Sequence, residues 1–153
     1  MSVSIRVATK SDMPAILALY AQPELDDGKT LSLSEAENLL SKIKSYPNYK
    51  IYVAEIEESM VGTFALLIMD NIGHLGAPSG LVEQVAVAPA WQGRDVGKSM
   101  MDYARKICRE AGCYKIALSS NLKRERTHTF YESLGFKKHG FSFCVDTMEG
   151  SNS

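Results

Sequence analysis

Residues 81–111 constrain the fold of this chain most, because a strand, a glycine-containing turn and a helix follow one another there without a gap. Leu81–Val87 (LVEQVAV) has the apolar character of a strand, and Pro89 closes it. From Gly97 to Ala111 the apolar residues fall on one helical stripe. The turn feeds a helix N-terminus, where unpaired backbone N–H groups and the helix dipole favour an anion. This arrangement predicts a domain of mixed α and β structure.

The turn itself, WQGRDVGKS at residues 91–99, allows three interpretations. In a nucleotide-binding P-loop a glycine stands five positions before the Gly-Lys pair, but that position holds Gln92, and Gly93 comes one residue too late. A P-loop domain would also need several further parallel strands, and too little chain follows Ser99. The other interpretations are a different anion cradle and an ordinary strand-to-helix turn with two permissive glycines.

The rest of the chain alternates strand and helix signals. Strands are predicted at 4–8, 50–55, 60–70, 81–87, 113–118 and 136–145, and helices after Ser11, after Ser32, at 97–111 and at 127–134. Hairpins in the first half and two helix crossovers in the second predict an α/β (α+β) fold with one mixed sheet and helices on its faces. The length of 153 residues suits one domain, predicted at 1–147, with a flexible tail at 148–153.

The composition argues against several classes of function. The formal net charge is −1, from 17 basic and 18 acidic residues, so bulk charge attracts neither nucleic acid nor a membrane surface. Cys108, Cys113 and Cys144 lack metal-ligand spacing, and the N-terminal MSVSIRVATK lacks the apolar core of a secretion signal. The longest apolar stretch, Val61–Met69, is about half of what crosses a bilayer. We therefore expect a cytoplasmic protein without a metal ion.

Three separated segments together resemble the GNAT N-acetyltransferases: VEQVAVAPAWQGRDVGKSMM, CYKIALSSN and THTFYESLGF, in this order and with suitable separations. The resemblance covers essentially the whole chain and is strongest over residues 81–143. It implies the GNAT fold, with a mixed central sheet of about six to seven strands flanked by about four helices. It also implies acetyl transfer from acetyl-CoA to a primary amine by direct attack in a ternary complex, and a homodimer.

The family's cofactor motif is Q/R-x-x-G-x-G/A, and residues 92–97 match it except that Asp95 replaces the first motif glycine. The resemblance implies cofactor contacts from Val85, Ala86, Val87, Gln92, Gly93, Arg94, Asp95, Val96, Gly97, Lys98, Asn121 and Arg124. Aspartate tolerates left-handed backbone angles better than most residues, so the turn should survive. Its carboxylate would repel a pyrophosphate by about 1 kcal/mol in water, and Arg94 and Lys98 would offset that repulsion.

Acetyl transfer to an amine needs a base and an acid. A primary ammonium ion has a pKa near ~10, so a proton must leave before the nitrogen attacks, and the departing thiolate needs a proton. Tyr131 resembles the family's thiolate-protonating tyrosine, and Glu83 stands where many members carry the glutamate that deprotonates the amine, often through water. Because histidine titrates near neutral pH, His128 and His74 are alternative bases, whereas His139 is interpreted as a surface residue.

Glu83 is unusual even without the resemblance. It shares the parity of Leu81, Val85 and Val87, so a regular strand would place its carboxylate on an apolar face. Either a bulge re-aims the side chain or the carboxylate is buried, and both are commoner at functional sites than elsewhere. Backbone N–H groups at such a distortion would also suit the oxyanion that forms in acyl transfer.

The acceptor is less defined. SSNLKRERTHTFYESLGFKKHGFSF is similar to the small-amine branch of the family, including aminoalkylphosphonate N-acetyltransferases, and Cys113–Lys115 is similar to the glucosamine-phosphate N-acetyltransferases. The basic run from Lys123 to Arg126 is either a solvated loop face or a site for the cofactor's 3′-phosphate or an anionic substrate group. Residues 20–34 and 70–80 would shape the acceptor pocket. Two alternatives stay open: acetylation of a protein or peptide, and a non-catalytic module that binds acyl-CoA for regulation.

Overall fold

The computed structural model describes residues 2–148, which divide into two compact units, the first ending at Leu118 and the second beginning at Ser119. The expected tail at 148–153 lies outside the described residues except for Met148. Within residues 2–148, no helix combines the length and the apolar character that a bilayer crossing requires.

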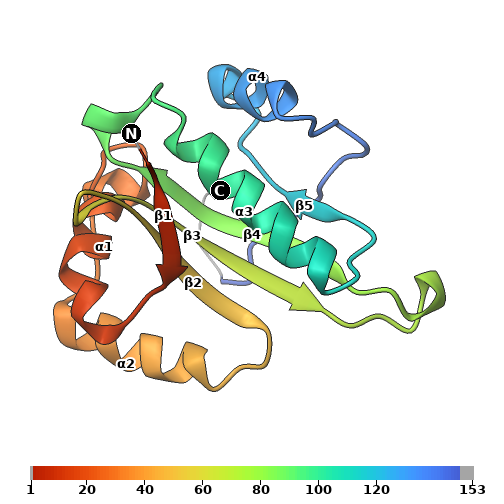
Figure 1. Ribbon diagram of the computed structural model, residues 1–153, viewed down its shortest axis with the longest axis horizontal. Helices are drawn as coiled ribbons and strands as arrows, with labels where there is room; N and C mark the ends of the chain where they lie inside the picture. Colours follow the sequence, from red (N-terminus) through yellow and green to blue (C-terminus); the bar gives the residue numbers. More distant parts are fainter. Residues whose placement is uncertain (1, 149–153) are drawn as a thin grey trace. The chain divides into compact units, whose positions relative to one another are not determined.

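The first unit is built on one mixed sheet with the strand order β1-β2-β3-β4-β5 (Figure 1). Its strands are β1 (Ser4–Val7), β2 (Tyr49–Ile56), β3 (Ser59–Met69), β4 (Ser79–Val87) and β5 (Ile116–Leu118). Neighbours are antiparallel from β1 to β4, and β5 runs parallel to β4. The predicted mixed sheet is confirmed. The expectation of six to seven strands is wrong for the described residues, which form five.

The strand predicted at 136–145 accounts for part of this difference, because the structure assigns no strand there. Phe141, Phe143 and Val145 alternate with other residues as they would in a strand, but they are 90%, 91% and 85% exposed. An extended segment becomes a strand only when a neighbouring strand pairs with its backbone, and within the second unit no strand does so. The strand predicted at 113–118 is also shortened to β5.

Helices α1 (Met13–Tyr20), α2 (Leu33–Lys44) and α3 (Val96–Glu110) belong to the first unit, and α4 (Glu125–Ser133) belongs to the second. The Ser32 side chain caps α2 by accepting a hydrogen bond from the Glu35 amide at 3.3 Å, as the spacing of these residues predicts. Ser11 is not the cap of α1, because a 3₁₀ turn at Lys10–Asp12 comes first.

Different helices cover the two faces of the sheet. On one face, α1 and α2 contribute to a buried cluster of Ala8, Met13, Ile16, Ala36, Leu40 and Val53. On the other face, α3 crosses β3 and β4 (Figure 1) and buries Met100, Met101, Ala104 and Cys108. Glycines allow this close approach: a Cβ at Gly62 would lie 2.9 Å from the Met100 sulfur, and one at Gly80 would lie 2.5 Å from the Cys108 sulfur.

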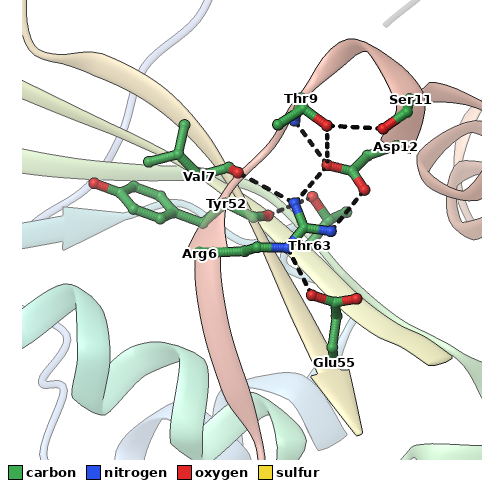
Figure 2. Close-up of polar contacts among 8 residues, drawn as sticks. All are labelled: Arg6, Val7, Thr9, Ser11, Asp12, Tyr52, Glu55 and Thr63. Carbon is green, nitrogen blue, oxygen red and sulfur yellow. Dashed lines mark hydrogen bonds and ion pairs between the residues drawn. The ribbon is translucent and has the colours of Figure 1, made fainter. Parts of the chain in front are cut away.

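A charged cluster ties the N-terminal strand to the rest of the first unit (Figure 2). Arg6 donates to both carboxylate oxygens of Asp12, at 2.7 and 2.8 Å, and to Glu55 at 2.7 Å. The Thr9 amide also donates to Asp12 at 2.7 Å. Asp12 is only 7% exposed, and the hydrogen bond from Arg6 lowers the pKa of its carboxyl to about 2. The cluster therefore joins β1, the start of α1 and β2.

This cluster predicts how stability depends on pH. The pKa of Asp12 falls from 3.8 to about 2 on folding. The stabilisation is therefore complete above pH 4 and is lost as the pH falls toward about 2, because the unfolded chain binds the proton first. Asp12→Asn should lower the free energy of unfolding at pH 7 by about 1–3 kcal/mol and flatten its decline between pH 4 and pH 2. Urea unfolding at a series of pH values measures both effects.

Asp70, which is exposed, provides the matched control. Asp70→Asn should keep both the stability at pH 7 and the decline below pH 4. A decline that stays as steep in Asp12→Asn as in the natural chain would show that other carboxylates cause it.

Candidate active site

The central feature of the candidate site is a bulge in β4. Ala65 of β3 pairs with Glu83, and Thr63 pairs with Ala86, so two residues of β4 lie opposite Phe64 alone. Gln84 takes a left-handed conformation at φ 54°, as one residue in a bulge often does. Of the two outcomes that the sequence allowed for Glu83, the bulge is the one that is found. The Glu83 side chain is exposed.

β4 and β5 separate directly after their short pairing. They pair only from Gly80 to Val82 on β4, whereas β4 continues to Val87. In the first unit, no strand covers the β5 side of β4 from the bulge onward. This open edge contains the three strand residues that were expected to contact the cofactor, Val85, Ala86 and Val87. A free strand edge suits an extended ligand that carries amide groups.

The turn after β4 presents a row of unpaired amides. Gly93 and Asp95 take left-handed conformations at φ 76° and 65°, and the first helical hydrogen bond of α3 runs from the Ser99 amide to the Asp95 carbonyl. The amides of residues 93–98 donate to no other described residue. A Cβ on Gly93 would meet no atom within 4 Å, so the space beside the turn is open. These residues fit a pyrophosphate, and aspartate at position 95 preserves the turn as expected.

The charged side chains of the turn already have partners. The Arg94 guanidinium lies 5.4 Å from the centre of the Trp91 ring. Lys98 donates to Asp102 on the next turn of α3 at 2.7 Å, and this hydrogen bond raises the pKa of Lys98. Neither cation forms an ion pair with Asp95, but the Asp95 charge also contributes to the raised pKa of Lys98. Lys98 is therefore already close enough to Asp95 to interact with its charge.

Two contributors from the end of α1 were missed by the sequence analysis. The Tyr20 hydroxyl donates to the Gln84 carbonyl in the bulge at 3.3 Å. The Gln22 amide donates to the Val87 carbonyl at the end of β4 at 3.0 Å. Each contact joins residues more than 60 positions apart, so no local pattern signals it.

In the second unit, Asn121 and Arg124 form the turn before α4. The Asn121 side-chain oxygen accepts from the Lys123 amide at 2.9 Å, and its backbone carbonyl accepts from the Arg124 amide at 3.0 Å. The His128 ring nitrogen Nε2 lies 2.8 Å from the same carbonyl and must be the donor in this hydrogen bond. His128 therefore has a structural contact that explains its place without a catalytic role.

Tyr131 lies on α4 between two aromatic rings. The ring centres of Phe130 and Phe136 are 5.2 and 5.7 Å from its own. Burial raises the pKa of Tyr131, although the positive charge of Arg124 acts in the opposite direction. The hydroxyl donates to no other described residue. A neutral phenol without a protein acceptor is suited to give a proton to a ligand.

His74 lies at the far end of β4 from the turn. It belongs to the 3₁₀ turn His74–Gly76 before β4, where its ring stacks on Tyr114 at 4.1 Å. The unpaired amides of residues 93–98 follow the opposite end of β4. The strand advances about 20 Å over the six residues from Ser79 to Val85, so His74 lies far along the strand from Val85. His139 is exposed. In residues 2–148, no three side chains of the types that bind metals are grouped to hold an ion.

Comparison with known proteins identifies the family. The family model described as acetyltransferase (GNAT) domain matches residues 47–138. The glucosamine 6-phosphate N-acetyltransferase of Trypanosoma brucei brucei is 29% identical over 147 residues, which cover 95% of this chain and 97% of that protein. The aminoalkylphosphonate N-acetyltransferase of Salmonella typhimurium is 29% identical over 142 residues, covering 91% and 88%.

A solved structure agrees with this result. The crystal structure of a Trypanosoma brucei acetyltransferase superposes with a TM-score of 0.80 at 28% identity, covering 95% of this chain and 99% of that one. The fold, the bulged strand and the amide-lined turn are thus found in a chain whose sequence also matches the family model over more than half its length. The chain therefore belongs to the GNAT family of acetyltransferases, which are enzymes that use acetyl-CoA.

Proposed function

We propose that this chain transfers the acetyl group of acetyl-CoA to a primary amine of a small molecule, by direct attack in a ternary complex, and that residues 1–147 act as one GNAT domain. The observation that carries this proposal is the row of unpaired amides at residues 93–98, next to the open edge of β4. In a GNAT protein this combination suits the pyrophosphate and the pantetheine arm of one cosubstrate.

Within the proposed site, the residues divide into binding and chemical groups. The turn from Gln92 to Lys98 would hold the pyrophosphate, and the edge of Val85–Val87 would pair with the pantetheine arm. Asn121 and Arg124 would contact the cosubstrate from the second unit. Bound acetyl-CoA supplies a thioester carbonyl carbon that an uncharged amine can attack. The chain itself must remove a proton from the amine and deliver one to the sulfur.

We assign these two proton transfers to Glu83 and Tyr131. Glu83 is exposed beside the bulge, so it can take the ammonium proton directly or through a water molecule. Tyr131 is neutral at physiological pH, as an ordinary tyrosine is, and burial raises the pKa of its phenol further. It would protonate the thiolate as the carbon–sulfur bond breaks. Backbone amides at the bulge are suited to stabilise the oxyanion.

The acceptor is proposed to be a small anionic amine. The two relatives compared above are named for glucosamine 6-phosphate and for aminoalkylphosphonates, and both names denote amines that carry a phosphorus-containing anion. With acetyl-CoA, the chain should therefore acetylate such amines faster than it acetylates neutral glucosamine. Release of free thiol measures the rate, and mass spectrometry of the product identifies the acetylated amine.

This screen also separates the alternatives. Faster acetylation of lysine peptides than of any small amine would contradict the proposed acceptor class and favour a protein N-acetyltransferase. Binding of acetyl-CoA without turnover on any amine would favour a regulatory module instead of an enzyme.

The proposed acid can be tested with Tyr131→Phe, which keeps the ring and removes the proton. The turnover number should fall by roughly ten- to ten-thousand-fold, the range expected for a general acid. The dissociation constant for CoA, measured by calorimetry, should stay nearly unchanged. Tyr103→Phe is the control, since the Tyr103 ring, on α3, contacts the Tyr52 ring of β2. Unchanged turnover in Tyr131→Phe would remove this residue from the role.

Asp95 can be tested with two variants that separate charge from backbone. Asp95→Asn removes the negative charge and retains a residue that tolerates a left-handed conformation, whereas Asp95→Gly also relieves the backbone. Both should tighten CoA binding by roughly five-fold, which corresponds to about 1 kcal/mol. Only Asp95→Gly should also raise the melting temperature. Weaker CoA binding in both variants would show that the carboxylate contributes favourably.

A homodimer and a cytoplasmic location complete the proposal. Phe141, Phe143 and Val145 are exposed at alternate positions, and a segment with this pattern can pair with the edge of a sheet in a second copy. Cys108 and Cys113 are free thiols, as a reducing compartment would keep them. Analytical ultracentrifugation of the purified chain reports its oligomeric state directly.

A further inference from the structure

The end of α1 is attached to the bulge of β4 by a tyrosine. Tyr20 is the last residue of α1, and its hydroxyl donates to the Gln84 carbonyl at 3.3 Å. Burial raises the pKa of Tyr20 to about 12, so the phenol stays neutral and remains a donor at any physiological pH. The accepting residue is the one with the left-handed backbone, at φ 54°. The hydrogen bond therefore acts at the most distorted point of the strand.

The same hydroxyl lies close to β3 at the position where the register changes. Thr63 is near enough to lower the pKa of Tyr20, against the larger effect of burial, and Thr63 itself is fully buried. Thr63 also donates from its hydroxyl to the Tyr52 carbonyl in β2 at 2.8 Å. Because Thr63 pairs with Ala86, it lies directly beside the bulge. Tyr20 is thus hydrogen-bonded to β4 and lies beside β3 where the pairing of the two strands is irregular.

Glu83 lies on the same face of the sheet as this contact. Residues that pair across an antiparallel ladder share a face, and so do residues two apart in one strand. Glu83 pairs with Ala65, and Ala65 is two residues from Thr63, whose side chain meets Tyr20. Any movement of the bulge that followed loss of the Tyr20 hydrogen bond would therefore change the direction of the Glu83 side chain.

Two residues beyond Tyr20, a glutamine makes the equivalent attachment to the turn. The Gln22 side-chain amide donates to the Leu19 carbonyl at 2.9 Å and to the Val87 carbonyl at 3.0 Å. Its side-chain oxygen accepts from Gln92, the first residue of the cofactor motif, at 3.3 Å. Gln92 also donates to the Val87 carbonyl at 3.2 Å. One short segment at the end of α1 therefore holds both the bulge and the start of the turn.

We propose that Tyr20 and Gln22 are positioning residues for acetyl transfer, which rests on the function proposed above. Tyr20 fixes the bulge and with it the direction of Glu83. Gln22 fixes the end of β4 against the turn that would hold the pyrophosphate. The distance between pyrophosphate and thioester is set by the length of the cosubstrate, so the turn and the bulge must keep a matching separation. A displacement of about 1 Å in such an arrangement costs roughly 100-fold in rate.

Tyr20→Phe tests the first part, since it removes one hydroxyl and keeps the ring. The turnover number should fall roughly 10- to 100-fold, while the dissociation constant for CoA changes by less than about two-fold. In a Glu83→Gln background, the same change should cause little additional loss, because Tyr20 acts through Glu83. Tyr103→Phe is the control: the Tyr103 ring, on α3, forms a T-shaped contact with the Tyr52 ring of β2, and this variant should keep full turnover.

Gln22→Met tests the second part, because methionine has a similar length but no amide. CoA affinity should fall roughly five-fold, whereas Tyr20→Phe should leave it intact. Hydrogen exchange supplies a readout that does not depend on activity. The amides of residues 83–87 should exchange faster in Tyr20→Phe, and not in Tyr103→Phe, if the hydroxyl holds the bulge.

The outcomes distinguish this inference from the function on which it rests. If the natural chain neither binds nor uses acetyl-CoA, the proposed function fails. If the natural chain is active but Tyr20→Phe turns over at the same rate, or its loss is fully additive with Glu83→Gln, the positioning role fails and the proposed function stands. Unchanged CoA affinity in Gln22→Met would remove Gln22 from the positioning pair.

Discussion

One extra residue in β4 determines how the candidate site of the first unit is arranged. In a regular ladder, Val85 and Val87 would share the face of Leu81 and Glu83. The bulge comes directly after Glu83 and turns these two valines to the opposite face, and β4 continues past the end of β5 toward the turn. A bulge leaves backbone groups without ladder partners, so it persists only where other contacts compensate. Here Tyr20, from a helix distant in sequence, provides such a contact at the Gln84 carbonyl, and Gln22 bonds to the Val87 carbonyl at the end of the strand.

The sequence was most informative where structure depends on neighbouring residues. The hairpin of β2 and β3, the cap of α2 and the strand–turn–helix joint all follow from local periodicity, and each is present. Position 95 illustrates this, because aspartate tolerates the left-handed backbone that the turn adopts there. The resemblance to the GNAT family added the cosubstrate and the proposed acid and base, which periodicity does not provide.

The residues that were missed act over long sequence distances. Arg6 meets Asp12 and Glu55 only after β1 has paired with β2, and Tyr20 meets Gln84 only after α1 has packed against the sheet. A single sequence contains no periodic signal for such pairs. The strand predicted at 136–145 failed for a related reason: alternation gives a segment the capacity to pair, but a strand also needs a partner in the right place.

The two glycines under α3 have a consequence for the turn as well as for packing. Gly62 lies against Met100 near the start of the helix, and Gly80 lies against Cys108 near its end. The helix therefore packs closely on the sheet at two separate positions. A side chain added at either glycine would push that end of α3 away from the sheet and change the angle between helix and sheet. The row of unpaired amides lies at the N-terminal end of this helix. The contact at Gly80, near the other end, therefore also helps to set the direction in which these amides point toward a bound anion.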